Sequence, residues 1–385
     1  MTSTGFTFCD FSPFYTPTGG GIRTYHDAKL AWFAAQQRHH YFLLVPGAQF
    51  ALTPHGPNAT VVTFYGAKVS DDYRLPLDLA SVRRFLDRLR PDVIETGDPW
   101  ISGPLGLLFR QLGYTNFLSS FYHSDPVSTY LAPQAGMTGV LGPLRRRVAQ
   151  WVGRPLLDLQ RRYDLTLTSS AWVEQMLHAN GVANMTRVPF GVDPIFTEVG
   201  RTRLPRWPRK RLLYVGRLQR DKAIDVLIGA IPELLRVRGT TLTVVGTGPA
   251  EPQLRVFESQ AVRLVGYVSS RARLAEIYAE HDVLLAPGPY ETFGLAALEG
   301  LAAGLSLVAP DAGGTAELLG TLAKPHIFKR DDQADFVRAV RAATDADPLT
   351  ELRASVSLAD RYGTWSDAIA REVDIYCRYL SHCTT

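Results

Sequence analysis

Short apolar runs alternate with amphipathic segments of helical length along almost the whole chain. Such a strand-then-helix alternation predicts parallel sheets with crossover helices. The helical patterns include Gly21–Gln37, Leu79–Leu89, Gly103–Leu112, Ile224–Val237 and Arg271–Glu280. The predicted strands are Phe6–Cys9, Tyr41–Val45, Val61–Phe64, Val93–Thr96, Phe117–Phe121, Leu212–Val215, Thr241–Val245, Arg263–Val265, Val283–Ala286 and Ser306–Ala309.

The length of the chain predicts two domains. Its 385 residues exceed what one hydrophobic core usually serves, and a hydrophobic content of 46% suffices for two cores. Residues 201–211 read RTRLPRWPRKR, a polar, proline-broken stretch before a new strand, so we place a hinge near Pro194–Arg211. We expect a Rossmann-like domain over residues 1–195, a second over 196–363, and a terminal helix within 364–385 that packs back across the hinge.

Charge and cysteine content exclude several classes of protein. A net charge of +4 fits anionic ligands or an anionic membrane surface, but is too small to indicate nucleic acid. Cys9, Cys377 and Cys383 are odd in number and match no metal-site spacing. The first residues lack a signal-peptide pattern, and no run approaches the ~18 apolar residues of a membrane span. We expect a cytoplasmic protein, at most associated with the inner face of a membrane.

The stretch PGPYETFGLAALEG, residues 287–300, combines the features of a ligand site. It follows a predicted strand and leads into a helix that should begin near Gly294. Glycine lets the backbone approach a ligand, and the free N–H groups and dipole of the helix favour a diphosphate. Glu291 precedes the helix, and Glu299 lies one turn after Leu295. Such carboxylates suit sugar hydroxyls, which donate hydrogen bonds to them.

The pattern E-x-F-G-L-x-x-x-E, from Glu291 to Glu299, resembles the signature of the retaining GT-B glycosyltransferases of group 1 or family 4, which include bacterial lipid and cell-envelope hexosyltransferases. The resemblance implies two doubly wound α/β domains that face a central cleft. It implies that Glu299 binds the ribose of a nucleoside-diphosphate sugar and that Glu291 binds the transferred hexose. The amides of Phe293, Gly294 and Leu295 would line the sugar and the diphosphate.

A second motif opens the second half of the chain. Gly216 and Arg217 follow a predicted strand, and Lys222 lies five residues further on. A glycine turn and two cations at the carboxyl end of a strand suit a diphosphate, and fixed cations can neutralise a leaving group without a metal ion. The resemblance assigns this role to Arg217 and Lys222, while Ala223 stands where the family frequently has glycine.

Further segments follow in the order of the family. Tyr267 and Val268, in VGYV, resemble the loop that meets the nucleobase through backbone atoms. In the first half, the resemblance places Gly20 and Gly21, in PTGGGI, against the donor diphosphate. Three consecutive glycines cost backbone entropy, which is tolerable where a backbone must approach a ligand, although a flexible connector is the alternative.

Polar residues also follow predicted strands of the first half. His123, in FYHSD, lies just past a strand, at the edge of a sheet where ligands bind. The resemblance implies that His123 contacts the donor sugar and helps to organise the reaction centre; a structural or solvated histidine is the alternative. Asp98 ends the preceding strand and is a candidate for orienting acceptor hydroxyls. We expect His26, His39 and His40 on helix surfaces and assign them no role.

Arginines concentrate between residues 145 and 162, in a segment that also carries Trp151, valines and leucines. A basic amphipathic helix of this kind can lie on anionic lipid. A packed helix with a solvated arginine face explains the same pattern, so both interpretations stay open.

We therefore predict a retaining, metal-independent hexosyltransferase that uses no cofactor and forms an α-glycoside from a UDP- or GDP-sugar. Arg217 and Lys222 would stabilise the leaving diphosphate, and Glu291 and His123 would position the hexose. By resemblance, the acceptor is a hydroxyl of a lipid or a cell-envelope glycan; a soluble small molecule is the alternative.

Three other functions fit the residues less well. A nonhydrolysing sugar-nucleotide epimerase should lack the two glutamates at the helix entrance. A dinucleotide-dependent oxidoreductase needs G-x-G-x-x-G, which the turn GTGP at residues 246–249 does not continue. A non-catalytic sugar-nucleotide-binding scaffold is disfavoured because the cations, glutamates and histidine of the motifs are all present.

Overall fold

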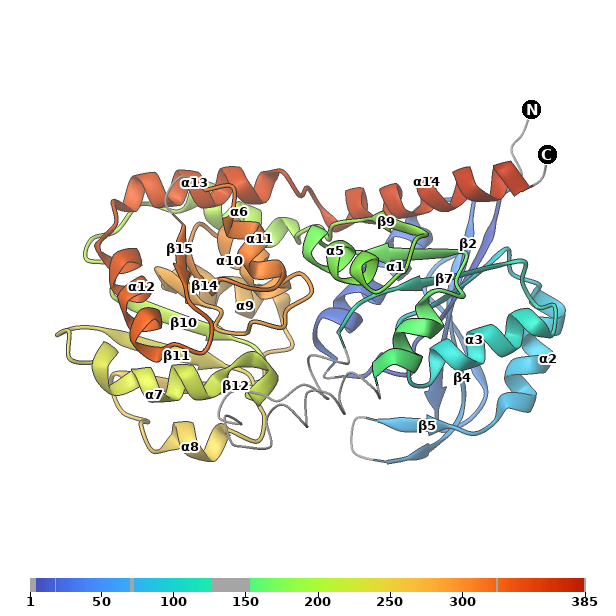
Figure 1. The fold of residues 1–385 in the computed structure, drawn as a ribbon, viewed down its shortest axis with the longest axis horizontal. Coiled ribbons are helices and arrows are strands. Elements are labelled where there is room, and N and C mark those ends of the chain that lie inside the picture. Colours follow the sequence, from blue (N-terminus) through green and yellow to red (C-terminus); the bar gives the residue numbers. More distant parts are fainter. Residues whose placement is uncertain (1–4, 18, 70–72, 126–152, 323–324, 384–385) are drawn as a thin grey trace.

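The computed structural model describes residues 5–17, 19–69, 73–125, 153–322 and 325–383. Within them the chain forms two mainly parallel sheets with helices packed on their faces, and the two α/β units lie side by side (Figure 1). The fold class predicted from the alternation of strands and helices is confirmed.

The N-terminal sheet is doubly wound. Its strands are β1 (Thr7–Phe11), β2 (His40–Gly47), β3 (Ala51–Pro54), β4 (Ala59–Lys68), β5 (Arg74–Pro76), β6 (Val93–Thr96), β7 (Phe117–Phe121), β8 (Leu165–Thr168) and β9 (Met185–Arg187). They are ordered β3-β4-β2-β1-β6-β7-β8-β9, with β5 paired to β4. Only β3 and β5 run antiparallel to β4. The strand order reverses between β1 and β6, and ligands of such sheets bind outside the carboxyl ends at this point.

The C-terminal sheet repeats this topology. Its strands are β10 (Arg211–Val215), β11 (Thr241–Val245), β12 (Val262–Gly266), β13 (Val283–Leu285), β14 (Ser306–Pro310) and β15 (His326–Phe328). They are all parallel and ordered β12-β11-β10-β13-β14-β15. The order reverses between β10 and β13, so the sheet predicts a ligand site at the ends of these two strands.

Helices cover both faces of each sheet. They are α1 (Gly20–Ala35), α2 (Leu79–Leu89), α3 (Ser102–Gln111), α5 (Ala171–Ala179), α6 (Pro194–Thr202), η2 (Arg220–Lys222), α7 (Ile224–Leu234), α8 (Glu251–Arg255), α9 (Arg271–Glu280), α10 (Leu295–Ala302), α11 (Gly314–Leu319), α12 (Gln333–Asp345), α13 (Pro348–Asp360) and α14 (Trp365–Cys383). In β1, Phe8 packs with α1 and α14, while Cys9 joins the core beneath α2 and α3. This alternation follows from the period of two of a strand.

The predicted elements are all present, and the bounds of β6, β7, β11, α2 and α9 agree with the prediction. Strands β3, β5, β8, β9 and β15 were not predicted. Each has three or four residues. Runs this short give little periodicity, and their pairing partners rather than their own sequence make them strands.

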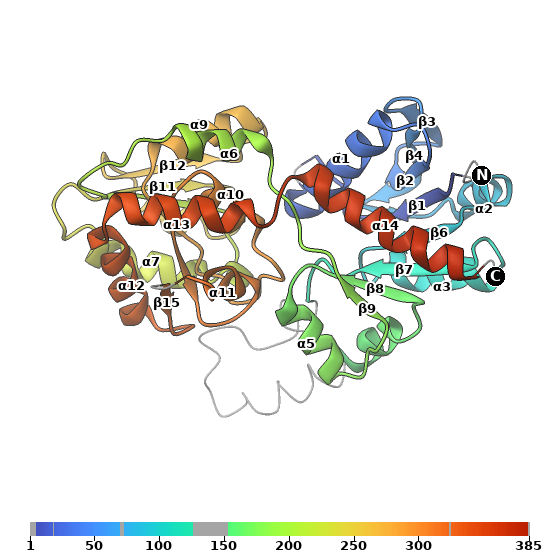
Figure 2. The ribbon, with the colours of Figure 1, turned by 90° about the horizontal axis from the view of Figure 1, so that it is seen from above.

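An apolar junction and the last helix connect the two α/β units. The ring of Phe190 lies 5.2 Å from that of Phe293 and 5.3 Å from that of Trp365. Helix α13 runs along the C-terminal unit, and α14 continues on the same side over the N-terminal unit (Figures 1 and 2). The Tyr376 ring of α14 lies 5.8 Å from that of Phe8. The end of the chain is therefore part of the N-terminal core.

The described part of the chain contains no helix with the length and apolar content to cross a bilayer. Residues 145–152 of the arginine-rich segment lie outside the described residues. Arg154, Arg161 and Arg162 are exposed, and Arg161 forms an ion pair with Asp158 at 2.6 Å. These three arginines belong to a solvated face.

A substitution at Gly191, in the segment between β9 and α6, tests the junction of the two units because this position has no room for a side chain. A Cβ there would lie 2.0 Å from the carbonyl oxygen of Thr364. We predict that Gly191→Ala lowers the midpoint of thermal unfolding and costs about 1–3 kcal/mol, since two backbone segments must separate. Gly320→Ala is the control, because its φ is −60° and its closest contact is 3.4 Å, and it should stay within about 1 kcal/mol of wild type. Equal unfolding midpoints for the two variants would contradict the close packing of Gly191 against Thr364.

Candidate active site

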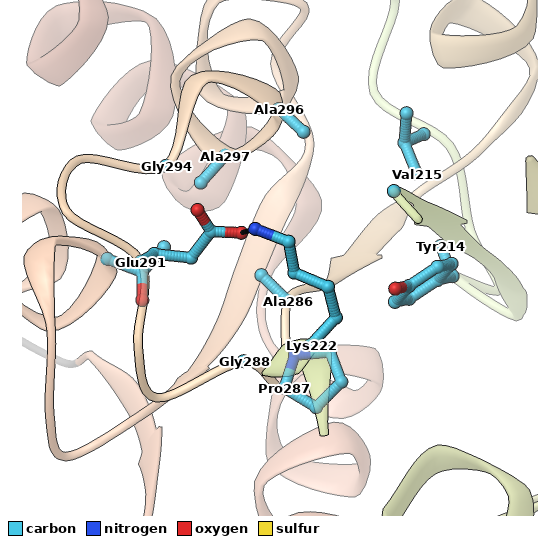
Figure 3. Close-up of a pocket in the computed structure, with 12 residues that line it drawn as sticks. Tyr214, Val215, Lys222, Ala286, Pro287, Gly288, Glu291, Gly294, Ala296 and Ala297 are labelled. Atoms are coloured by element: carbon cyan, nitrogen blue, oxygen red, sulfur yellow. Dashed lines mark hydrogen bonds and ion pairs between the residues drawn. The ribbon is translucent and has the colours of Figure 1, made fainter. Parts of the chain in front are cut away.

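The residues predicted for the donor site lie at the switch point of the C-terminal sheet. Gly216 directly follows β10, and the loop that carries Glu291 follows the neighbouring strand β13. Both segments line a small cavity together with Lys222, Gly294 and Thr315 (Figure 3). The motifs from the two parts of the sequence thus meet where doubly wound sheets bind their ligands.

Lys222 and Glu291 point toward each other across this cavity (Figure 3). The Nζ atom of Lys222 donates to Oε1 of Glu291 at 2.6 Å, and both side chains are partly exposed. A partly exposed ion pair is worth little, so Lys222 can exchange its carboxylate partner for a phosphate at small cost. The next residue, Ala223, has a left-handed backbone with φ 47°, which explains why glycine suits this position.

The turn after β10 holds Arg217 beside the same site. Its Nη2 atom donates to Oδ2 of Asp221 at 2.8 Å, while the side chain stays about half exposed. Tyr214 Oη donates to the Arg217 carbonyl at 2.8 Å and fixes the turn. Gly246 packs against this turn, because a Cβ there would lie 1.9 Å from the Gly216 carbonyl oxygen. The glycine turn at residues 246–249 therefore allows close packing against the turn that carries Arg217.

Helix α10 begins as predicted. Gly294 is its N-cap, with φ 93°, and a Cβ there would lie 2.4 Å from Cγ2 of Thr315. Phe293 is buried just before the cap, and Leu295 opens the helix. The N–H groups of the first turn have no partner within the helix, so they can bind an anion.

Glu299 lies on the buried side of α10. Its Oε1 accepts from Nη1 of Arg271 at 2.8 Å, and its Oε2 accepts from Tyr278 Oη at 3.3 Å. Burial raises the pKa of Glu299, although the Arg271 charge opposes the shift. Arg271 Nε also donates to Oδ2 of Asp193, the residue before α6, at 3.4 Å. The buried Nη2 of Arg271 has no hydrogen-bond partner among the described residues.

Sequence reasoning missed Arg271 and Thr292. Arg271 starts a helix after a serine cap, a position where surface arginines are common, so no signal singled it out. Thr292 lies within the motif of Glu291, yet only the structure shows its contact. Its Oγ1 donates to the carbonyl of His123 at 2.7 Å, and its own carbonyl accepts from Ser170 Oγ at 2.6 Å. The donor motif is thus joined directly to the N-terminal unit.

His123 lies at this contact, with its ring held by aromatic neighbours. The ring stacks on Phe121 at 4.6 Å and meets the edge of Tyr25 at 4.7 Å. Burial lowers the pKa of the His123 imidazole well below its usual value, and His26 and Lys29 act in the same direction, so the ring is neutral at pH 7. Its buried Nε2 has no hydrogen-bond partner within the described residues, which suits a ligand hydroxyl.

Gly21, in the first turn of α1, lies against the start of α10. A Cβ on Gly21 would lie 3.0 Å from Cδ1 of Leu295, whereas Gly20 has open space around it. Tyr267 Oη donates to the carbonyl of Pro17 at 3.3 Å, and Val268 is partly buried beside it. These contacts place Gly21 and Tyr267 where the two units meet.

Asp98 follows Gly97, which lies beside the His123 ring, but its carboxylate has a different task. It is buried, and its carboxylate accepts from the N–H groups of Trp100 and Ile101 at 2.9 and 2.7 Å and from that of Ser102 at 3.1 Å. These bonds fix the turn into α3 and occupy the carboxylate. The geometry gives no support to the acceptor role that we expected for Asp98.

The expectation that the histidines near α1 are surface residues of a helix was wrong. His26 is buried, with its Nδ1 3.1 Å from Tyr41 Oη. His39 lies beyond the helix, and its buried Nδ1 accepts from the N–H of Phe6 at 3.1 Å. His40 begins β2 and is exposed. No periodic signal distinguishes a buried histidine with a specific partner from a solvated one.

The fold defines a two-domain α/β protein with polar loops at the carboxyl ends of both sheets, and comparisons with known proteins identify its family. Residues 19–196 match the family described as Glycosyltransferase Family 4, and residues 209–345 match Glycosyl transferases group 1. The chain is 31% identical over 306 residues to the GDP-mannose-dependent alpha-(1-6)-phosphatidylinositol dimannoside mannosyltransferase of Mycobacterium tuberculosis, which covers 77% of each chain. It is 32% identical over 286 residues to glycogen synthase of that organism, which covers 69% of this chain and 63% of that one.

Solved structures show the same fold. Sucrose-phosphate synthase from Thermosynechococcus elongatus matches with a TM-score of 0.77 and 19% identity, over 98% of this chain and 100% of that one. A trehalose-6-phosphate protein from E. coli bound with UDP-2-fluoro glucose matches with a TM-score of 0.66 and 15% identity, over 96% and 99%. The chain belongs to the group 1 / family 4 glycosyltransferases, enzymes that use nucleotide-sugar donors, and has their GT-B fold.

Nucleotide binding tests the place of Glu299. We predict that GDP or UDP raises the unfolding midpoint of the wild type, because a ligand that binds only the native state stabilises it. In Glu299→Gln this increase should be much smaller, since the charge is lost and an NH2 donor replaces one of the two oxygens that accept from ribose hydroxyls. Glu276→Gln, which removes only a surface partner of Arg273, should keep it. An undiminished shift in Glu299→Gln would remove Glu299 from the donor site.

Gly97, directly after β6, tests the place of His123. A Cβ there would lie 3.0 Å from Cδ2 and 3.5 Å from Nε2 of the His123 ring. We predict that Gly97→Ala displaces the ring and lowers kcat about tenfold, because sub-ångström misplacement of reacting groups is costly. The unfolding midpoint should change little. A normal kcat in a folded Gly97→Ala variant would show that turnover does not depend on the position of His123.

Proposed function

We propose that the protein transfers a hexose from GDP- or UDP-sugar to a hydroxyl of a lipid or a cell-envelope glycan, with retention at the anomeric carbon and without a metal ion or cofactor. The observation that carries this proposal is the Lys222–Glu291 pair at the cavity of the C-terminal unit, in a loop that meets His123 of the other domain through Thr292. Glu299 and Arg271 add a buried carboxylate and a guanidinium beside it.

The chemistry follows from these groups. The acceptor oxygen attacks the anomeric carbon on the face from which the diphosphate leaves, and the bond between this carbon and the phosphate oxygen breaks with its electron pair on the diphosphate. The acceptor proton passes to the departing phosphate oxygen. Arg217 and Lys222 stabilise the charge that develops there, in place of a metal ion. Glu291 and the neutral His123 hold the hexose hydroxyls and fix the orientation of the sugar.

The lipid or glycan acceptor is supported by the relatives. One relative is a phosphatidylinositol dimannoside mannosyltransferase and another, from Arabidopsis thaliana, is a sulfoquinovosyl transferase, 29% identical over 287 residues. Two relatives use GDP-mannose by name, which makes GDP-mannose the first donor to test. With such an acceptor, the enzyme would act in the cytoplasm at the inner face of the membrane, in peripheral contact with anionic lipid.

An assay with radiolabelled GDP-mannose, GDP-glucose, UDP-glucose and UDP-galactose tests the proposal. Each donor is incubated with mixed bacterial membranes and with soluble glycans, and the label is followed into organic and aqueous phases. We expect one donor to label an acceptor in EDTA, with an α-linkage by NMR. A β-linked product would contradict retention, and loss of activity in EDTA would contradict metal independence. Label in a small soluble product would show that the acceptor is a soluble small molecule instead of a lipid or a glycan.

Lys222 gives the sharpest variant for this assay. We predict that Lys222→Ala lowers kcat by about 10² to 10³, because it removes a fixed charge from the leaving group. Lys210→Ala is the matched control: Lys210, at the amino end of β10, only donates to the carbonyl of Arg238, so its loss should leave turnover unchanged. Equal turnover of the two variants would refute the role of Lys222, and nucleotide binding without any transfer would favour a scaffold.

A further inference from the structure

A cluster of buried charges lies beneath the site, in the core of the N-terminal unit. Lys29 of α1 is 1% exposed, and its Nζ lies 2.8 Å from Oδ2 of Asp10 in β1 and 2.7 Å from Oε1 of Glu372 in α14. Oε1 of Glu95 in β6 is 3.3 Å away. Three carboxyl groups thus surround one ammonium group, and each belongs to a different element.

Such a cluster is costly to bury, so its place in the molecule needs an explanation. Removing several charges from water is repaid only when the geometry is good and further hydrogen bonds satisfy the remaining atoms. Tyr25, one turn before Lys29, supplies these bonds. Its Oη lies 2.8 Å from Oε1 of Glu95 and 2.9 and 3.0 Å from the two carboxyl oxygens of Glu372.

Tyr25 also forms one wall of the His123 ring. The Tyr25 and His123 rings meet edge to face at 4.7 Å and 62°, while Phe121 and Phe190 stack nearly parallel to the His123 ring at 4.6 and 6.0 Å. The buried Nε2 of His123 has no hydrogen-bond partner among the described residues. The orientation of this imidazole therefore depends on where the Tyr25 ring lies.

We propose that Tyr25 is a positioning residue for His123, and that α14 holds Tyr25 in place through Glu372. The proposal rests on the proposed role of His123 in transfer. It makes the last helix, which leaves the C-terminal unit and packs on the N-terminal one, a support of the reaction centre as well as of the fold.

The geometry favours a proton on the carboxyl pair, because three carboxyl groups share the charge of one ammonium group. One Tyr25 hydroxyl lies between two carboxyl groups and has a single hydrogen to donate. If Glu372 carries a proton, its O–H donates to Tyr25 Oη, and Tyr25 donates to Glu95, so every group is satisfied. If Glu372 is ionised, both carboxylates compete for the same hydrogen. Lys29 Nζ also donates to Glu372 Oε1 at 2.7 Å and to Tyr25 Oη at 3.0 Å, so the arrangement favours the carboxylic acid form of Glu372 through its competition with Glu95.

The titration of the cluster agrees with this arrangement. Burial raises the pKa of Glu372 to about 8, a shift that Lys29 opposes and Glu95 reinforces. Because the folded protein holds this proton more tightly than the unfolded chain does, the stabilisation is full at low pH and is lost as the pH rises through about 8. The groups that face Glu372 are Lys29 and Tyr25 from α1, Glu95 from β6, Asp10 from β1 and Tyr376 from α14 itself.

The tyrosines and the lysine of the cluster titrate well above pH 8. Burial raises the pKa values of Tyr25, Tyr41 and Tyr376 well above the usual range, and the carboxylates act in the same direction. Burial would lower the pKa of Lys29, but the charges of Asp10, Glu372 and Glu95 raise it overall. His123 is already neutral. A change between pH 7 and 9.5 therefore reports on the Glu372–Glu95 pair.

The test combines kinetics with NMR of protein carrying 13C-labelled histidine, in which His123→Asn assigns the His123 signal. In the wild type we expect that signal to move with a midpoint near pH 8 and kcat to fall roughly tenfold per pH unit above it. In Glu372→Gln, whose amide can donate to Tyr25 as the acid does, the signal and the ratio of kcat at pH 9 to kcat at pH 7 should no longer depend on pH.

Two variants of Tyr25 separate the ring from the hydroxyl. Tyr25→Leu removes the wall of His123, so kcat should fall about 10²-fold while KM for the donor stays within about twofold. Tyr25→Phe keeps the aromatic ring, so its kcat should fall less than that of Tyr25→Leu. Asp374→Asn, on the exposed side of α14, removes only a surface pair with Arg378 and is the control with wild-type kinetics and pH profile.

Separate outcomes overturn the inference and the proposed function. A His123 signal in Glu372→Gln that still moves near pH 8, or that keeps its wild-type position in Tyr25→Leu, overturns the positioning role whether or not the enzyme is active. An unchanged kcat in His123→Ala instead overturns the proposed role of His123, and then the NMR measurement still decides whether Tyr25 and Glu372 position its ring.

Discussion

The hydrogen bond from Thr292 Oγ1 to the carbonyl of His123 joins the carboxyl ends of two parallel sheets. Parallel strands carry their ligand-binding loops at those ends, so a contact between them brings both sets of loops to one cleft. Gly21 of α1 then lies against the start of α10, and Lys222 lies beside Glu291. Each group is ordinary by itself. We propose that the meeting of the two sheet edges makes them a site for a charged sugar nucleotide.

The cations of this site are held by carboxylates in the structure. Lys222 pairs with Glu291 and Arg217 pairs with Asp221, both on partly exposed sides. Such pairs keep the cations in place at little energetic expense and release them readily to a phosphate. The buried cluster around Lys29 differs, because losing one partner there leaves an uncompensated charge in the core. One set of charges is therefore suited to exchange, and the other to holding Tyr25, His123 and α14 in a fixed arrangement.

The sequence predicted much of the fold for physical reasons, and it pointed to the residues of the proposed donor site. Long strands and helices carry a period, and Gly216, Gly294 and Glu299 lie in local patterns whose order along the chain is informative. Residues whose role depends on a distant partner carry no such pattern. Lys29 and Glu372 are 343 residues apart, so neither reveals the other, and His26 was taken for a surface residue. Asp98 shows the converse: the end of a strand is a good place for a ligand, but local N–H groups occupy its carboxylate.

The most direct test of the site is a crystal structure with GDP or UDP bound. The account predicts that the β-phosphate lies between Arg217 and Lys222, with Lys222 Nζ moved from Glu291 to a phosphate oxygen, and with the ribose hydroxyls on Glu299. The glycine loop before α1 should contact the diphosphate from the opposite domain. A nucleotide bound elsewhere would contradict the proposed donor site. So would a nucleotide bound here with the Lys222–Glu291 pair intact and the phosphates away from both cations.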